Sequence, residues 1–262
     1  MGNLPYLRRK KIIDILGHNQ YADVSNLSNL FNVSEMTIRR DLEKLEKEGE
    51  VIRIYGGAQL KTKKSYEGTI EERLNVNKSE KAALAKKAAG LIEDGDVISF
   101  DASTTALEIS KLIKTKKKLT VITNNISIAI ELSDATDITV ILLGGFLRRI
   151  SLSLVGAAQR KVLESMYIDK AFISSKALSL EQGLTDATVE EGEAKQAMIE
   201  RSNKVFVVVD RTKLGKVAFF QVCGKETIDK IITDSLEPFT REQEKCVNGF
   251  RELGVEVIIA EK

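Results

Sequence analysis

Cysteine, histidine, proline and tryptophan are scarce in this sequence, and each shortage excludes a class of protein. Among its 262 residues are two cysteines (Cys223 and Cys246), one histidine (His18), two prolines and no tryptophan. Two distant cysteines without a C-x-x-C pattern make neither a zinc finger nor a secreted disulfide scaffold. A single histidine gives no support to a His-based triad, and low proline content argues against a disordered chain. We expect no metal and no cofactor.

Long apolar runs and an excess of one charge are also missing. No stretch approaches the roughly 20 apolar residues of a membrane span, and the basic start at residues 1–11 lacks the apolar core of a signal peptide. Forty basic and thirty-eight acidic residues give a net charge of +2, so any basic surface must be local. With 43% hydrophobic residues the chain can bury a core. We expect a soluble, cytoplasmic protein with no membrane partner.

Two patterns divide the sequence near residue 60. Before it, three helical patterns precede a hairpin, whereas after it β-branched apolar runs alternate with helical patterns. Apolar runs with little alternation suit strands buried on both faces of a mostly parallel sheet. The expected strands are 97–100, 119–123, 138–143, 171–174, 205–209, 228–233 and 255–259. The sequence therefore predicts an N-terminal domain at residues 1–60, a polar connector with some helical character at 61–79 and an α/β domain at 80–262.

The N-terminal part has the pattern of a helix-turn-helix at about residues 22–41. Ile38, Leu42 and Leu45 recur on one face of its second helix, which Ser34 can cap. The opposite face is polar and basic near its start, as a helix that enters the major groove of DNA requires. The predicted DNA-contacting residues are Ser34, Met36, Thr37, Arg39, Arg40, Lys44, Arg53 and Tyr55.

A simpler alternative for Arg39 and Arg40 is a solvated helix face, paired with acids such as Asp41. The order of three helices and a Gly56-Gly57 hairpin favours DNA binding, because that hairpin can place Arg53 and Tyr55 as a wing. The basic run at residues 8–11 adds positive charge to the same domain.

The run V-S-E-M-T-I-R-R-D-L at residues 33–42, followed by R-I-Y-G-G-A at 53–58, resembles the DeoR family of bacterial transcription regulators. The family pattern is V-S-x-x-T-I-R-R-D-L and then R-x-H-G-G-A, so Tyr55 stands where histidine is usual. The resemblance implies a winged helix-turn-helix that binds double-stranded operator DNA.

In the second domain, polar residues follow the expected strands at their carboxyl ends. The sequence D-A-S-T-T at residues 101–105 leads from a strand into a helix, where backbone N–H groups and hydroxyls can bind phosphate. The alternative is ordinary structure, with Ser103 as a helix cap, Gly144-Gly145 as a tight turn and Lys213 as a solvated charge. Several such ends on one rim favour a pocket. The predicted effector-contacting residues are Asp101, Ala102, Ser103, Thr104, Thr105, Thr123, Asn124, Gly144, Gly145, Arg148, Lys176, Asp210 and Lys213.

This domain also resembles the DeoR-family sensor domain, so the resemblance covers about residues 5–235. It implies a Rossmann-like fold similar to ribose-5-phosphate isomerase and CoA-transferase-like proteins, and a phosphorylated sugar as the effector. It further implies a homo-oligomer, either dimer or tetramer, that represses a sugar or carbohydrate catabolic operon. The family loop usually reads D-x-G-[ST]-T, from which Ala102-Ser103 departs, and Lys176 stands where a small residue is often found.

Two other functions compete with this one. An isomerase would need a positioned base and electrophile, and no spacing among Asp101, Asp210, Lys176 and Lys213 identifies such a pair. An architectural or RNA-binding protein would need an aromatic-rich strand or a dense basic stripe, and the sequence has neither. The sequence therefore predicts a ligand-sensing regulator with no catalytic residues.

Overall fold

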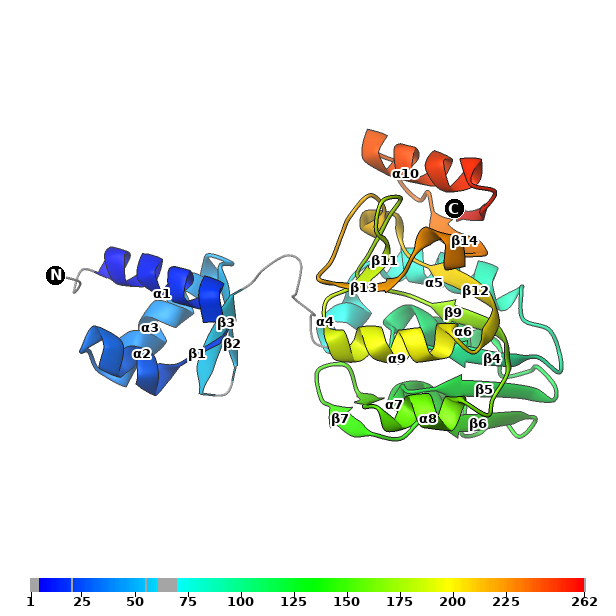
Figure 1. Ribbon diagram of the computed structural model, residues 1–262, viewed down its shortest axis with the longest axis horizontal. Coiled ribbons are helices and arrows are strands. Elements are labelled where there is room, and N and C mark those ends of the chain that lie inside the picture. Colours follow the sequence, from blue (N-terminus) through cyan, green and yellow to red (C-terminus); the bar gives the residue numbers. More distant parts are fainter. Residues whose placement is uncertain (1–4, 20, 55, 61–69, 262) are drawn as a thin grey trace. The chain divides into compact units, whose positions relative to one another are not determined.

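The computed structural model describes residues 5–19, 21–54, 56–60 and 70–261. The chain divides into two compact units, Met1–Tyr66 and Glu67–Lys262, which Figure 1 shows and which are described one at a time below.

The first unit consists of three helices and a small antiparallel sheet. Asp23 caps the second helix by accepting hydrogen bonds from the amides of Ser25 and Asn26, and Asn32 adopts the left-handed conformation that turns the chain into the third. The winged helix-turn-helix predicted from the sequence is confirmed, with β1 as an addition that pairs with β3. The elements are α1 Pro5–Asn19, β1 Tyr21–Asp23, α2 Val24–Phe31, α3 Glu35–Lys47, β2 Val51–Ile54 and β3 Gly57–Leu60.

The second unit is built on a seven-stranded sheet in which every neighbouring pair is parallel, in the order β15-β14-β12-β9-β4-β5-β6. Each expected strand overlaps one of these, so the predicted parallel α/β fold is confirmed. Their bounds are β4 Val97–Phe100, β5 Leu119–Thr123, β6 Ile138–Leu142, β9 Ile168–Ile173, β12 Ser202–Val208, β14 Lys230–Asp234 and β15 Glu256–Ala260.

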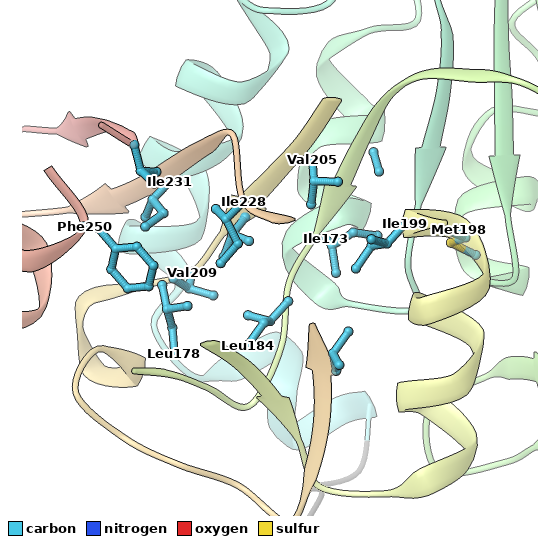
Figure 2. Packing of buried hydrophobic residues seen from close by; sticks show 14 of the residues in the cluster. Ile173, Leu178, Leu184, Met198, Ile199, Val205, Val209, Ile228, Ile231 and Phe250 are labelled. Atoms are coloured by element: carbon cyan, nitrogen blue, oxygen red, sulfur yellow. The ribbon is translucent and has the colours of Figure 1, made fainter. Parts of the chain in front are cut away.

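Helices cover both faces of this sheet. Strand β12 shows why residues 205–208 are all apolar: Val205 and Val207 point into one cluster, and Phe206 and Val208 into the other. Figure 2 shows the first cluster, where Val209 lies near Phe250 of α10 and Ile173 lies near Ile199 of α9. The helices are α4 Ile70–Asn75, α5 Lys78–Ala89, α6 Thr104–Leu112, α7 Ile126–Glu131, α8 Ala158–Leu163, α9 Val189–Ile199 and α10 Arg241–Glu252.

Several short elements were not predicted from the sequence. In chain order they fall between strands of the main sheet, and their strands form separate small sheets. Gly183 has a φ of +65°, and a Cβ there would lie 2.2 Å from the carbonyl oxygen of Cys223, so only glycine allows this approach. These elements are the hairpin of β7 Phe146–Arg148 and β8 Ser153–Val155, the sheet of β10 Ala177–Ser179, β11 Gly183–Asp186 and β13 Phe220–Cys223, and the 3₁₀ turns Arg211–Lys213 and Lys225–Thr227.

The second unit begins before residue 80, where the sequence placed its start. Residues 61–69 of the expected connector lie outside the described residues, but from Ile70 the chain forms α4. Leu74 of α4 packs against the apolar cluster that α5 and α6 share. The last ten residues of the expected connector, 70–79, are therefore part of the second unit.

The order of the strands marks one point at the carboxyl edge of the sheet. From β4 the chain proceeds to β5 and β6 on one side, and from β9 it proceeds to β12, β14 and β15 on the other. Open parallel sheets bind ligands where the strand order reverses in this way. The ends of β4 and β9 flank that point.

Candidate functional site

The outward face of α3 carries the residues predicted to contact DNA. Met36 is 59% exposed, and Arg39, Arg40 and Lys44 are exposed. Ser34 caps the helix, and its hydroxyl lies 2.9 Å from that of Thr37. Arg39 pairs with Glu35 at 3.3 Å, whereas Arg40 and Lys44 have no ion pair with any residue that the structure describes.

Asp41 is buried and binds the start of α1 instead of the arginines beside it. Its carboxylate lies 2.5 Å from Nε of Arg8 and 3.3 Å from Nη1 of Arg9, and Arg8 is 4% exposed. The alternative weighed from the sequence paired Arg39 and Arg40 with acids such as Asp41, and Asp41 does not pair with either of them. Residues 8–11 were interpreted as one basic run, but Arg8 and Arg9 join α1 to α3.

The hairpin predicted to be a wing is formed by β2 and β3. Arg53 is exposed on it, and its Nε lies 2.8 Å from Glu46 of α3. Tyr55 lies outside the described residues. The wing therefore offers Arg53, already oriented by a carboxylate of the helix that it flanks.

In the second unit, the loop at residues 101–105 leads from β4 into α6 and contacts the end of β9. Asp101, Ser103, Thr104 and Thr105 are all buried, and Asp101 Oδ1 accepts a hydrogen bond from the amide of Ser174 at 3.2 Å. Ser103 Oγ accepts from the amide of Ala106, so it caps α6, as the simpler alternative required. Ala102 is buried in the same loop, and its carbonyl oxygen is used by α4 as described below.

The end of β12 reaches the same place. Lys213 Nζ lies 3.4 Å from Ser174 Oγ and 3.8 Å from Asp210 Oδ2. Although burial opposes it, Lys213 helps to hold the pKa of Asp210 below its ordinary value, so that carboxylate keeps its charge. Lys176, two residues after Ser174, is half-buried. The structure thus brings Asp101 and Lys213, which follow β4 and β12, to Ser174 at the end of β9.

The predicted residues that follow β5 and β6 have structural contacts with the β7–β8 hairpin. Thr123 Oγ1 accepts from the amide of Asn125, and Asn124 Nδ2 donates to the carbonyl of Leu154. A Cβ at Gly145, whose φ is +144°, would lie 2.3 Å from the carbonyl oxygen of Val155. Gly144 is exposed and accepts at its carbonyl from Gln159.

Arg148 lies against Glu191 of α9, with 2.6 Å between Nη1 and Oε1. The same carboxylate accepts from the hydroxyls of Ser151 and Ser153. Burial alone would raise the pKa of Glu191, but Lys195, Ser153 and Arg148 outweigh it and lower that pKa. The guanidinium therefore faces a buried, ionised carboxylate, which neutralises it as a partner for phosphate.

Lys195 was not predicted from the sequence, and it is buried among carboxylates. Its Nζ lies 2.6 Å from Asp186 and 3.2 Å from Asp101. Burial would lower the pKa of Lys195, but attraction to Asp186, Asp101 and Glu191 raises it. The signal that could have shown it is the spacing of Glu191 and Lys195, four residues apart on a helix whose remaining buried positions are apolar or small.

Two further cations were missed because they lie in or next to the expected connector. Arg73 Nη2 donates to the carbonyl of Ala102 at 3.1 Å. Lys81, 6% exposed, donates from Nζ to the carbonyls of Arg73 and Val76. Burial, and then the nearby charge of Lys213, lower the pKa of Lys81 to about 8. Arg73, Lys81 and Lys213 thus gather beside the loop at 101–105.

A cavity of about 340 Å³ opens next to Lys81. Half of the residues that line it are lysines, so a solvent-accessible, basic hollow adjoins this group of cations. The lining residues are Leu74, Asn75, Lys78, Lys81, Glu108 and Lys111.

Other kinds of site are not found in the part of the chain that the structure describes. No group of three or more metal-ligating side chains occurs there, and none of its helices has the length and apolarity to cross a bilayer. Burial raises the pKa of the Cys223 thiol to about 12, which leaves almost no thiolate as a nucleophile at neutral pH.

Comparison with known families identifies the family to which these two units belong. A family profile described as the DeoR-like helix-turn-helix domain matches residues 8–64, and one described as the DeoR C terminal sensor domain matches residues 76–235. The chain belongs to the DeoR family. The resemblance seen in the sequence is confirmed, and the α3 face belongs to a DNA-binding transcriptional regulator.

Relatives of this DeoR-family regulator align along almost its whole length. The regulator GolR of Listeria innocua is 36% identical over 98% of this chain and 99% of its own. The repressor GlcR of Bacillus subtilis is 38% identical over 86% of each chain. Among solved structures, ribose 5-phosphate isomerase A of Methanocaldococcus jannaschii is 17% identical over 53% of this chain and 55% of its own, with a TM-score of 0.39. At that TM-score the likeness says nothing about activity.

Proposed function

We propose that this DeoR-family regulator represses a sugar or carbohydrate catabolic operon and that a phosphorylated sugar modulates its binding to operator DNA. The observation that supports this most directly is the convergence of Arg73, Lys81 and Lys213 on the loop at residues 101–105. Relatives with the same two domains include a protein named as a repressor.

The phosphate of the effector is proposed to bind at this loop. The N-terminus of α6 begins at Thr104, and the partial positive charge of a helix N-terminus favours an anion. Arg73 and Lys213 carry full positive charge beside it, and the only acid that opposes Lys213 at close range among the described residues is Asp210. Arg148 is assigned to the hairpin instead, because Glu191 already neutralises it.

The sugar is proposed to lie toward the end of β5. The Oδ1 atom of Asn124 is buried and has no hydrogen-bond partner among the described residues, so it can accept from a hydroxyl group. Thr123 precedes it in the chain, and the side chain of Gln159 donates both to the Gly144 carbonyl and to the Leu154 carbonyl that Asn124 binds. Lys176 at the end of β9 is proposed as a second contact for the same ligand.

The ligand is proposed to be bound and not transformed. Lys195 has a raised pKa and lies between two carboxylates, so it stays protonated and is unsuited to act as a base. The protein is proposed to act as a dimer or tetramer, which would hold two heads at operator half-sites about one helical turn apart or a multiple of it.

The test uses the full chain in two steps. Selection from randomised DNA identifies an operator, and a thermal-shift screen then compares sugar phosphates with the same sugars without phosphate. A phosphorylated sugar should stabilise the protein and change operator affinity by about 5- to 150-fold, the usual range of coupling. A protein that selects no DNA sequence, or that converts a sugar phosphate into a product, would contradict the proposal.

A further inference from the structure

Helix α4 contacts both the loop of the proposed effector site and the turn between β7 and β8. At its start, the amide of Ile70 donates to the carbonyl of Ile150, in the turn between β7 and β8, at 2.9 Å. One turn later, Arg73 donates to the carbonyl of Ala102 in the loop at 101–105. Both partners belong to segments that carry predicted effector residues, although they lie far from α4 in the sequence.

The end of α4 is fixed by a different set of contacts. Lys81 of α5 donates to the carbonyls of Arg73 and Val76, which belong to the last turn of α4 and the residue beyond it. A cation at a helix C-terminus is favourable because the carbonyl groups there are unsatisfied. Leu74 adds apolar packing against the α5–α6 cluster. The end of α4 is therefore anchored by Lys81 and Leu74. Arg73 links α4 to the carbonyl of Ala102 in the loop at 101–105.

Resting on the effector site proposed above, we propose that Arg73 is itself an effector-binding residue and that α4 is the part of the sensor unit that responds to the ligand. An anion on the loop at 101–105 competes with the Ala102 carbonyl for the guanidinium of Arg73. The guanidinium is charged in both contacts, but the phosphate carries the opposite charge whereas the carbonyl is neutral, so the guanidinium exchanges the carbonyl for the phosphate.

This exchange changes α4 because Arg73 is attached to it. In chain order α4 is the first helix after the DNA-binding unit, which ends at Tyr66. A change in α4 therefore occurs at the start of the sensor unit, close in the chain to the DNA-binding unit. A ligand shifts an equilibrium only through contacts that differ between the two states. The contact that Arg73 makes with the Ala102 carbonyl in one state and with the ligand in the other is such a difference.

Hydrogen–deuterium exchange on the full chain tests this with inorganic phosphate as the probe and chloride at matched ionic strength as the reference. Phosphate should slow exchange in the segment 101–107 and change exchange in the segment 70–76. Helix α10, which lies at the other end of the chain, should exchange at the same rate in both conditions.

Three variants sharpen the experiment. Arg73→Ala should raise the phosphate concentration for half-maximal protection by about tenfold, the effect of losing one charge-assisted hydrogen bond, and should abolish the response of α4. Arg73→Lys keeps the positive charge and should recover part of the affinity. Lys87→Ala removes a positive charge from the exposed face of α5 and should behave as the parent protein does.

The outcomes separate this inference from the effector site on which it rests. If phosphate protects the loop in the parent protein while α4 is unchanged, the role of Arg73 and α4 is overturned and the effector site stands. The same follows if Arg73→Ala responds as the parent does. If neither segment responds to phosphate, the effector site is overturned as well.

Discussion

Arg39 and Arg40 are adjacent in the sequence, but the structure gives them different surroundings. Arg39 pairs with Glu35 one turn earlier on the exposed face of α3. Such exposed pairs contribute about 0–1 kcal/mol to stability, yet they orient the side chain. Arg40 points from the same helix without an acidic partner among the described residues, which leaves its guanidinium available to a base edge.

We expect Arg40→Ala to cost about 1–3 kcal/mol of specific binding, as the loss of a bidentate contact to a base does. A mobility-shift titration of the selected operator and a scrambled duplex, at one salt concentration, measures this. Lys47→Ala, at the exposed end of α3, is the matched control and should leave the ratio of the two affinities unchanged. Equal weakening on both duplexes by Arg40→Ala would assign Arg40 to a phosphate and not to a base.

Lys81 predicts a dependence on pH, because burial and Lys213 lower its pKa to about 8. Asp210 and Glu108 act in the opposite direction and Arg73 adds to the lowering. A bound anion favours the charged lysine, so anion affinity should fall as pH rises through about 8. Sulfate is a suitable probe because it does not titrate in this range, and calorimetry at several pH values gives the affinity.

The same shift acts on stability with the opposite sign. The pKa of Lys81 is lower in the folded protein than its ordinary value of 10.5, so between about 8 and 10.5 the unfolded chain binds the proton more strongly. The contribution of Lys81 to the free energy of unfolding therefore increases as pH rises through this window and is constant below it. Lys81→Met should remove both trends, and a variant that keeps the fall in sulfate affinity would show that another group titrates.

At the scale of elements, the pair of Arg8 and Asp41 shows what joins the helices of the first unit. Both side chains are almost fully buried, and they link α1 to α3 across 33 residues of sequence. Removing one partner of a buried pair leaves an uncompensated charge, which typically costs about 3–5 kcal/mol. Asp41→Ala should therefore lower the melting temperature of the first unit sharply, as calorimetry of the full chain would show.

A double variant distinguishes the ion pair from its packing. Arg8→Met with Asp41→Leu removes both charges and keeps apolar volume, so it should be much less destabilised than Asp41→Ala. If the two variants melt together, the loss comes from packing around α1 and not from an unpaired charge.

Elements with regular apolar patterns were predictable from the sequence, and those that depend on distant partners were not. The strand Val97–Phe100 and the cap Ser34 follow from local residue types, and both are found as expected. Helix α4 has mostly polar residues, and its position depends on Leu74 and on Lys81 of the next helix. Local patterns do not contain such contacts, so the segment was interpreted as a connector.

The candidate site shows the same limit at the level of single charges. The positions of Asp101 and Lys213 after strands predicted that they approach each other, because parallel strands end at one edge. Lys195 was not singled out, since nothing local shows that Asp186 and Asp101 lie beside it. For Arg148, the partner that decides its role is 43 residues away.

At the scale of the whole molecule, the two units must influence each other's ligands equally if the proposed regulation holds. Coupling between two binding sites is reciprocal, so the factor by which an effector changes operator affinity is the factor by which the operator changes effector affinity. We expect a factor of about 5–150, equivalent to about 1–3 kcal/mol. Isothermal titration of the stabilising sugar phosphate, with and without saturating operator DNA, measures the second factor, and mobility shifts measure the first.

Scrambled DNA should leave effector affinity unchanged, because the coupling depends on the operator-bound state of the head. Two factors that differ beyond error would mean that the sugar phosphate alters DNA binding through something other than this chain's sensor unit, whereas factors of one in both experiments would show that the units bind their ligands independently.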